Sequence, residues 1–157
     1  MRNVENVVDV ENEGELLSFR GAATGGDWLV AEAGLPAYGT DNAVMRLSFE
    51  LALAVLAYVS ELETHRRYVV ARQLVRCGTS VGANVREAQH AESRADFIHK
   101  CKIAAKEAEE TDYWLQLCTH APDYPTPPSP LTDALLSVRR LLARIIISSK
   151  ANAPKQL

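Results

Sequence analysis

One segment of the chain places a carboxylate and an imidazole one helical turn apart, in the sequence Glu87-Ala-Gln-His90. A Glu-x-x-His step supplies two metal ligands from one helix in di-iron bundle proteins, which also need a second copy of the step and two further glutamates. Glu107, Glu109 and Glu110 could add carboxylates, but no second Glu-x-x-His occurs. Because this ligand set is incomplete, we predict no metal and no cofactor, and a metal-dependent bundle enzyme stays as an alternative.

Other catalytic patterns are missing from the sequence. It contains no G-x-S-x-G nucleophile motif and no glycine-rich phosphate-binding loop. Its three cysteines, Cys77, Cys101 and Cys118, include no C-x-x-C pair, which favours free thiols in a reducing compartment. Neither a signal peptide nor an apolar run of about 18 residues is present. We therefore expect a cytoplasmic protein that is not an enzyme and does not span a membrane.

Paired arginines are the candidates for contacting nucleic acid. The pairs are spaced by one helical turn: Arg72 with Arg76, and Arg140 with Arg144. Such cations bind the phosphates of RNA or DNA, and Tyr68, Tyr113 and Trp114 could stack on bases. The alternative is a solvated helix face balanced by acids, with the aromatic residues in the core or in an interface. The net charge of −3 averages −5 for residues 1–40 with +2 for the rest of the chain, and because +2 is weak we slightly favour the solvated face.

Apolar residues recur at steps of three and four along most of the chain, which predicts helices at about 42–63, 66–91, 94–120 and 130–149. Thr40 or Asp41 is expected to cap the first helix, and Ser93 the third. Short connections, including the proline-rich segment 122–130, favour antiparallel neighbours. We predict an all-α, up-down-up-down four-helix bundle over residues 41–150. An irregular acidic arm (1–40) precedes it and a tail (151–157) follows.

Small and polar residues interrupt the second predicted helix. Gly78 and Gly82 each cost about 1 kcal/mol relative to alanine, so we expect a neighbouring helix to approach closely there. Ser80 and Asn84 lie one turn apart and need hydrogen-bond partners if they are buried. Lys106, Glu107 and Glu110 are the candidates on the third helix. We interpret this set as structural, and a ligand or subunit contact is the alternative.

Two stretches of the chain carry a recognisable signature. The first is Gln73-Leu-Val-Arg-Cys-Gly-Thr-Ser-Val-Gly-Ala-Asn-Val-Arg-Glu-Ala88, and the second runs from Asp96-Phe-Ile-His-Lys through Ile103 to Leu115. Together they resemble the bacterial four-helix bundle family named after the 23S rRNA intervening sequence, over about residues 42–149. The residues assigned to this structural motif are Gln73, Ser80, Asn84, Glu87, Glu107, Glu110 and Trp114. The N-terminal arm departs from the family, whose members usually begin near the first helix, close to Met45.

The resemblance implies a small helical protein, often a ring-shaped homopentamer, with no catalytic site. A related branch contains the accessory variability determinant of diversity-generating retroelements, which partners a reverse transcriptase and binds nucleic acid. The leading hypothesis is therefore a non-enzymatic, oligomeric scaffold that binds RNA, DNA or a nucleic-acid-processing partner such as a reverse transcriptase. The alternative is a structural homo-oligomer or protein adaptor that does not contact nucleic acid.

Overall fold

Helices account for nearly all of the residues that the computed structural model describes, residues 42–151. They are α1 (Ala43–Thr64), α2 (Tyr68–Ala88), α3 (Arg94–His120) and α4 (Ser129–Ala151). No strand occurs within this range, so the prediction of an all-α four-helix bundle is confirmed. The predicted arm (1–40) and the part of the tail after residue 151 lie outside the described residues.

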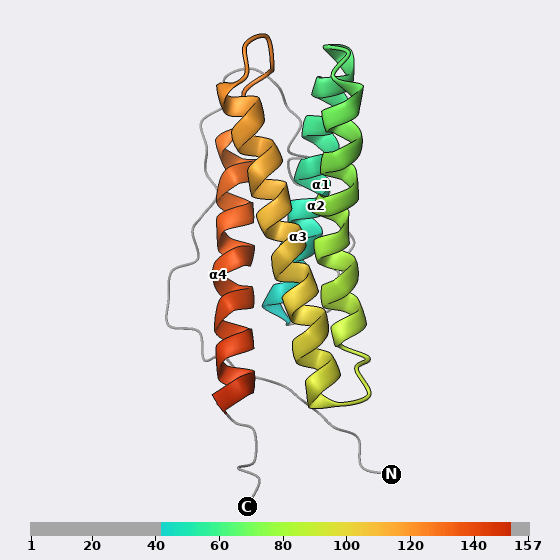
Figure 1. The fold of residues 1–157 in the computed structure, drawn as a ribbon, viewed down its shortest axis with the longest axis vertical. Helices are drawn as coiled ribbons and strands as arrows, with labels where there is room; N and C mark the ends of the chain where they lie inside the picture. The colour runs from blue at the N-terminus through green and yellow to red at the C-terminus, as the bar shows by residue number, and fades with distance from the viewer. Residues whose placement is uncertain (1–41, 152–157) are drawn as a thin grey trace, which may run out of the picture. The chain divides into compact units, whose positions relative to one another are not determined.

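The helices run alternately up and down (Figure 1). Each packs against two others, in the pairs α1–α2, α2–α3, α3–α4 and α1–α4, whereas the diagonal pairs α1–α3 and α2–α4 do not pack together. Leucines from three of the helices, including Leu51, Leu74 and Leu142, are fully buried at the centre. Burial of such side chains is the main stabilising contribution to the fold.

The ends of the helices follow from local hydrogen bonds and backbone angles. Asn42, rather than the predicted Thr40 or Asp41, caps α1: its side chain accepts a hydrogen bond from the backbone N–H of Val44 at 3.2 Å. Ser93 caps α3 as predicted. Helix α2 begins at Tyr68, two residues later than predicted, because Arg66 has a φ of 60°, which a right-handed helix does not allow.

The two glycines of α2 lie where α1 comes closest. A Cβ atom at Gly78 would lie 2.8 Å from a methyl carbon of Val55, and one at Gly82 would lie 3.4 Å from the carbonyl oxygen of Ser48. A larger residue at Gly78 would therefore force the two helices apart. This contact confirms the expected close approach and explains how the fold offsets the low helix propensity of glycine.

The connection between α3 and α4 is fastened to α1 and to the α1–α2 turn, which lies at the same end of the bundle (Figure 1). The Tyr58 hydroxyl of α1 donates a hydrogen bond to the carbonyl oxygen of Pro125 at 2.6 Å. The Arg67 guanidinium donates to the carbonyl oxygen of Asp123 and lies 4.7 Å from the centre of the Tyr124 ring. The proline-rich loop is thus bound to the α1–α2 turn.

Helix α1 is the most apolar of the described helices. By length and composition alone it could cross a membrane, although the core helix of a soluble protein meets the same criteria. Its buried side of Leu51, Val55 and Leu62 forms part of the bundle core. On its outer side Leu53 and Leu56 stay exposed, so core packing accounts for only part of its apolar character.

Candidate functional site: a polar seam and a cationic face

The signature residues gather along one edge of the bundle, where α2 meets α3. We call this edge the α2–α3 seam, and its residues are Gln73, Arg76, Ser80, Asn84 and Glu87 of α2 with Lys100, Glu107, Glu110 and Trp114 of α3. Steps of three and four keep each set on one side of its helix. Ion pairs between Arg76 and Glu110, and between Lys100 and Glu87 at 2.6 Å, connect the two helices.

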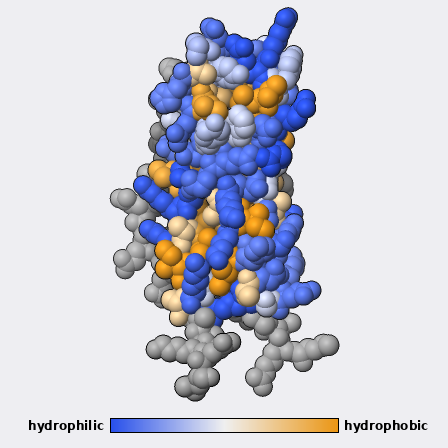
Figure 2. Space-filling model, in the orientation of Figure 1, coloured by the Kyte–Doolittle hydropathy of each residue, from blue (hydrophilic) through white to orange (hydrophobic). Residues whose placement is uncertain are grey.

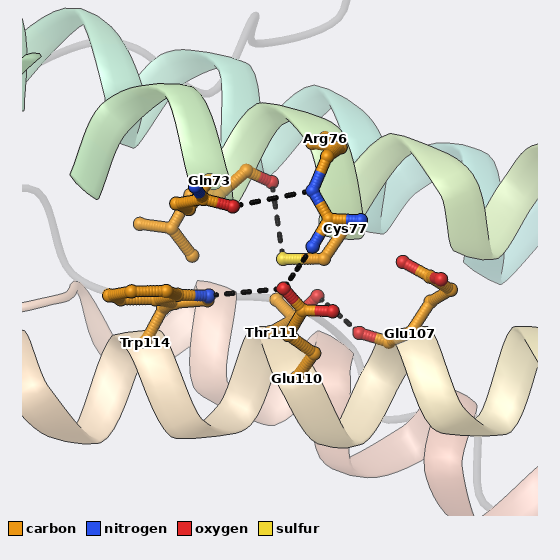
Figure 3. A network of polar contacts seen from close by, with 8 residues as sticks. Gln73, Arg76, Cys77, Glu107, Glu110, Thr111 and Trp114 are labelled. Carbon is orange, nitrogen blue, oxygen red and sulfur yellow. Dashed lines mark hydrogen bonds and ion pairs between the residues drawn. The ribbon is translucent and has the colours of Figure 1, made fainter. Parts of the chain in front are cut away.

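The middle of the seam is a hydrogen-bond network that converges on one carboxylate (Figure 3). Glu110 accepts from the Arg76 guanidinium and, at 3.4 Å, from the indole N–H of Trp114. Arg76 also donates to the side-chain oxygen of Gln73 at 3.3 Å. The hydrogen bond to Glu110 raises the pKa of Arg76. Within this network the Arg76–Glu110 pair joins α2 to α3, while Gln73 and Trp114 each bond to a residue of their own helix.

Ser80 and Asn84 find their partners within α2. The side-chain amide of Asn84 donates to the backbone oxygen of Ser80 at 2.9 Å and to its hydroxyl at 3.1 Å, instead of to the α3 residues that the sequence suggested. A side chain one turn along a helix reaches back to the preceding turn without any partner helix. Across the seam, one carboxylate oxygen of Glu107 is buried without a hydrogen-bond partner among residues 42–151.

The Glu-x-x-His step does not enter the interior of the bundle. Glu87 is exposed and pairs with Lys100, while His90 lies in the turn after α2 has ended and is exposed as well. No group of three histidine, cysteine or acidic side chains that could hold a metal occurs in the described part of the chain. The two residues therefore lack the inward placement that a di-iron site requires.

The predicted arginine pairs lie on separate surfaces. Arg72 and Arg76 belong to α2, whereas Arg140 and Arg144 belong to α4, and these helices occupy opposite corners of the bundle. Arg76 is also engaged by Glu110 and Gln73. One protomer therefore cannot present the four arginines as a single phosphate-binding surface.

A different set of cations is exposed on the adjacent helices α3 and α4. We call it the α3–α4 face, and it consists of the exposed or nearly exposed cations Lys102, Lys106, Arg140, Arg144 and Lys150. Residues 97–106 and 134–151 contain no aspartate or glutamate. The sequence prediction paired Arg140 with Arg144 but did not include the three lysines. The two acid-free runs are the sequence signal that could have connected them.

Arg139 connects α4 to α3 and pairs with two acidic side chains beside this face. Its guanidinium binds both carboxylate oxygens of Glu109, at 2.8 and 2.7 Å, and lies 3.0 Å from Asp112. Because the helices are antiparallel, this contact brings Arg144 to the level of Lys106. Hydrophilic side chains cover the middle of the side of the bundle seen in Figure 2, with apolar atoms exposed above and below.

The three thiols lie beneath these surfaces and are unreactive. Cys77, Cys101 and Cys118 are buried and unpaired. Burial raises the pKa of the Cys101 thiol to about 11 and also raises the pKa values of the other two. At neutral pH each thiol is protonated and acts as a small apolar core residue.

Comparison with known proteins supplies the family. The profile of the 23S rRNA-intervening sequence protein family matches residues 40–123. A crystal structure from Bacteroides thetaiotaomicron, described as a protein of unknown function from the S23 ribosomal protein family, is 38% identical with a TM-score of 0.62. The similarity covers 66% of this chain and 97% of that one. No curated protein matches the chain. The match extends over more than half of the sequence and includes the α2–α3 seam, so the chain belongs to the 23S rRNA-intervening sequence protein family.

Proposed function

We propose that this protein is a non-enzymatic scaffold that binds the phosphate backbone of nucleic acid through the α3–α4 face. One observation carries the proposal: five exposed cations lie on two adjacent helices, and Arg139 holds two of the carboxylates beside them, Glu109 and Asp112. A cluster of unpaired cations is the feature that phosphate binding requires. A nucleic-acid-processing enzyme such as a reverse transcriptase is the protein partner that the resemblance implies.

We further propose that the protein is cytoplasmic. This part of the proposal and the absence of an enzymatic activity rest on the surroundings of the carboxylates and the thiols. Glu87 and Glu110, the carboxylates of the seam with cationic partners, join α2 to α3. The buried thiols are unpaired, which suits a reducing compartment.

Salt dependence tests the phosphate contacts. Binding of a labelled RNA or DNA is measured by fluorescence anisotropy between about 50 and 200 mM salt, where phosphate-driven affinity falls steeply. The triple variant Lys102→Gln/Lys106→Gln/Arg140→Gln should reduce the slope of log affinity against log salt by about one unit per lost contact. The matched control Arg72→Gln removes an exposed cation from α2 and should leave the slope unchanged. If Arg72→Gln lowers the slope and the triple variant does not, α2 carries the binding instead.

A homo-oligomer without nucleic-acid binding is the second candidate, and the outer side of α1 favours it. Leu53 and Leu56 are exposed there. Beside them Met45, Phe49 and Ala52 of α1 line an open hollow against α2. An apolar surface of this kind suits contact with a second copy of the chain, and the resemblance implies a pentamer.

Light scattering separates the two candidates. The mass in solution should be a multiple of 17.2 kDa, and Leu56→Glu should lower it by placing a charge in the subunit contact. Leu117→Glu is the matched control, because Leu117 is similarly exposed but lies on α3. A monomer at every concentration would exclude the oligomer. An oligomer without affinity for nucleic acid at low salt would exclude the leading proposal.

A further inference from the structure

The α3–α4 face carries an aromatic ring in line with its lysines. Lys102, Lys106 and Tyr113 are separated by four and seven residues, so they lie along one outward stripe of α3. Tyr113 is 57% exposed. The ring therefore lies on the same side of α3 as the cations. The core position that the sequence offered as an alternative for Tyr113 is not the one it occupies.

The Tyr113 ring is held in place but not covered. It makes a T-shaped contact with Trp114, with ring centres 5.4 Å apart and planes at 68°. Trp114 is itself anchored by its hydrogen bond to Glu110 in the α2–α3 seam. A ring with few accessible orientations loses little entropy when a second flat group stacks on it.

The surroundings of Tyr113 combine apolar contact with positive charge. Leu136 of α4 is 41% exposed and lies three residues before Arg139, which brings it to the level of Tyr113 on the antiparallel helix. Along α3, Lys106 lies about 10 Å from Tyr113 and Lys102 about 6 Å further on, from the rise of the helix. Glu109 lies between Tyr113 and Lys106, but its carboxylate is occupied by Arg139.

We infer that the ligand of this face is single-stranded nucleic acid, with an unpaired base stacked on Tyr113 and the next phosphates of the strand on Lys106 and Lys102. The inference rests on the proposed function and specifies its ligand. In a duplex each base is stacked on its neighbours and paired, so it has no free face for an aromatic side chain. An exposed aromatic ring followed by cations at regular steps matches the pattern of single-strand binding surfaces.

The test compares a labelled single strand of uridines or thymidines with a duplex that carries the same number of phosphates. In the full chain, Tyr113→Ala should weaken binding of the single strand by roughly 5- to 50-fold and change duplex binding less than about twofold. Tyr113→Phe keeps the ring and should retain the affinity. Tyr68→Ala is the matched control, since Tyr68 is 55% exposed but lies on α2.

The outcomes separate this inference from the proposed function. Suppose that the Lys102, Lys106 and Arg140 substitutions weaken binding but Tyr113→Ala changes the affinity for neither the single strand nor the duplex. The proposed cationic face then stands, and the stacking inference is wrong. Equal losses for single strand and duplex would also overturn the inference. No binding of either nucleic acid at low salt would overturn both proposals. A lower molecular mass of Tyr113→Ala would show that Tyr113 belongs to a subunit contact, which would likewise overturn the inference.

Discussion

Helix α3 has cations on two of its sides, and they have different surroundings. Towards α2, Lys100 pairs with Glu87, and Glu110 receives Arg76 and Trp114. On the outward side, Lys102 and Lys106 have no carboxylate partner within residues 42–151. Exposed ion pairs contribute little to stability, but their geometry favours one register of two helices over others. Unpaired cations leave a positive potential that an anionic ligand can use. This difference supports a structural role for the seam and the binding role proposed for the face.

Removing the indole of Trp114 should give the largest effect on the seam. Trp114→Ala removes a half-buried ring that packs against the core, and we expect a loss of about 2 kcal/mol in the free energy of unfolding. The salt slope of nucleic-acid binding should stay the same, because no cation is removed. Trp114→Phe keeps most of the packing and should lose less than about 1 kcal/mol. Urea denaturation measures the free energy of unfolding of both variants. A change in the salt slope of nucleic-acid binding in Trp114→Ala would contradict the separation of the two surfaces.

Replacing Arg139 should affect the face more than the fold. Arg139→Met leaves Glu109 and Asp112 uncompensated beside the cations, so we expect nucleic-acid affinity to fall about tenfold. The free energy of unfolding should fall by less than about 1 kcal/mol, because the ion pairs are partly exposed. Arg139→Lys restores the charge and should recover most of the affinity. Unchanged affinity in Arg139→Met would show that the acids do not limit binding.

Raising the pH should weaken the core beneath both surfaces. The Cys101 thiol has a pKa of about 11 when folded, against an ordinary value of 9.0, so the unfolded chain releases this proton first. Stability is therefore complete below about pH 9 and falls as the pH rises towards 11, by about 1.3 kcal/mol for this group between pH 8 and 10. Cys101→Ala should reduce that fall by the same amount in urea denaturation. Equal pH dependence in both proteins would refute the assignment.

Breaking the central ion pair should give the smallest effect. Arg76→Met removes the partner of Glu110 at a position where the arginine side chain is 56% exposed, and we expect a loss below about 1 kcal/mol. Nucleic-acid affinity should be unchanged, in contrast to Arg139→Met. A loss of affinity as large as that of Arg139→Met would place Arg76 in the binding surface, as the sequence first suggested.

The helices were predictable because apolar residues at steps of three and four have few other ways to be buried. The close approach at Gly78 was predictable for a related reason, since a glycine inside a helix needs a compensating contact. The start of α2 was not, because the left-handed conformation of Arg66 leaves no mark in a sequence without glycine at that position.

The candidate site was less predictable, because it depends on which helices are neighbours. Spacing along one helix places Arg140 one turn from Arg144, but it cannot show that α4 adjoins α3 and lies diagonal to α2. Lys102 and Lys106 can be placed beside Arg140 only when the contact of Arg139 with Glu109 gives the register of α4 against α3. The sequence also predicted partners for Asn84 on α3. A hydrogen bond to Ser80 within α2 competes with such partners, and the prediction did not take it into account.

The fastening of the proline-rich loop has a consequence for how the bundle opens. Tyr58 and Arg67 attach this loop to α1 and to the α1–α2 turn, so α4 cannot separate from the other helices without releasing contacts at the end where it begins. Together with the α1–α4 packing, these contacts leave each of the four helices packed against two others. We expect native-state hydrogen exchange to show one cooperative unit, in which the slowest amides of α1 and α4 open with the same free energy.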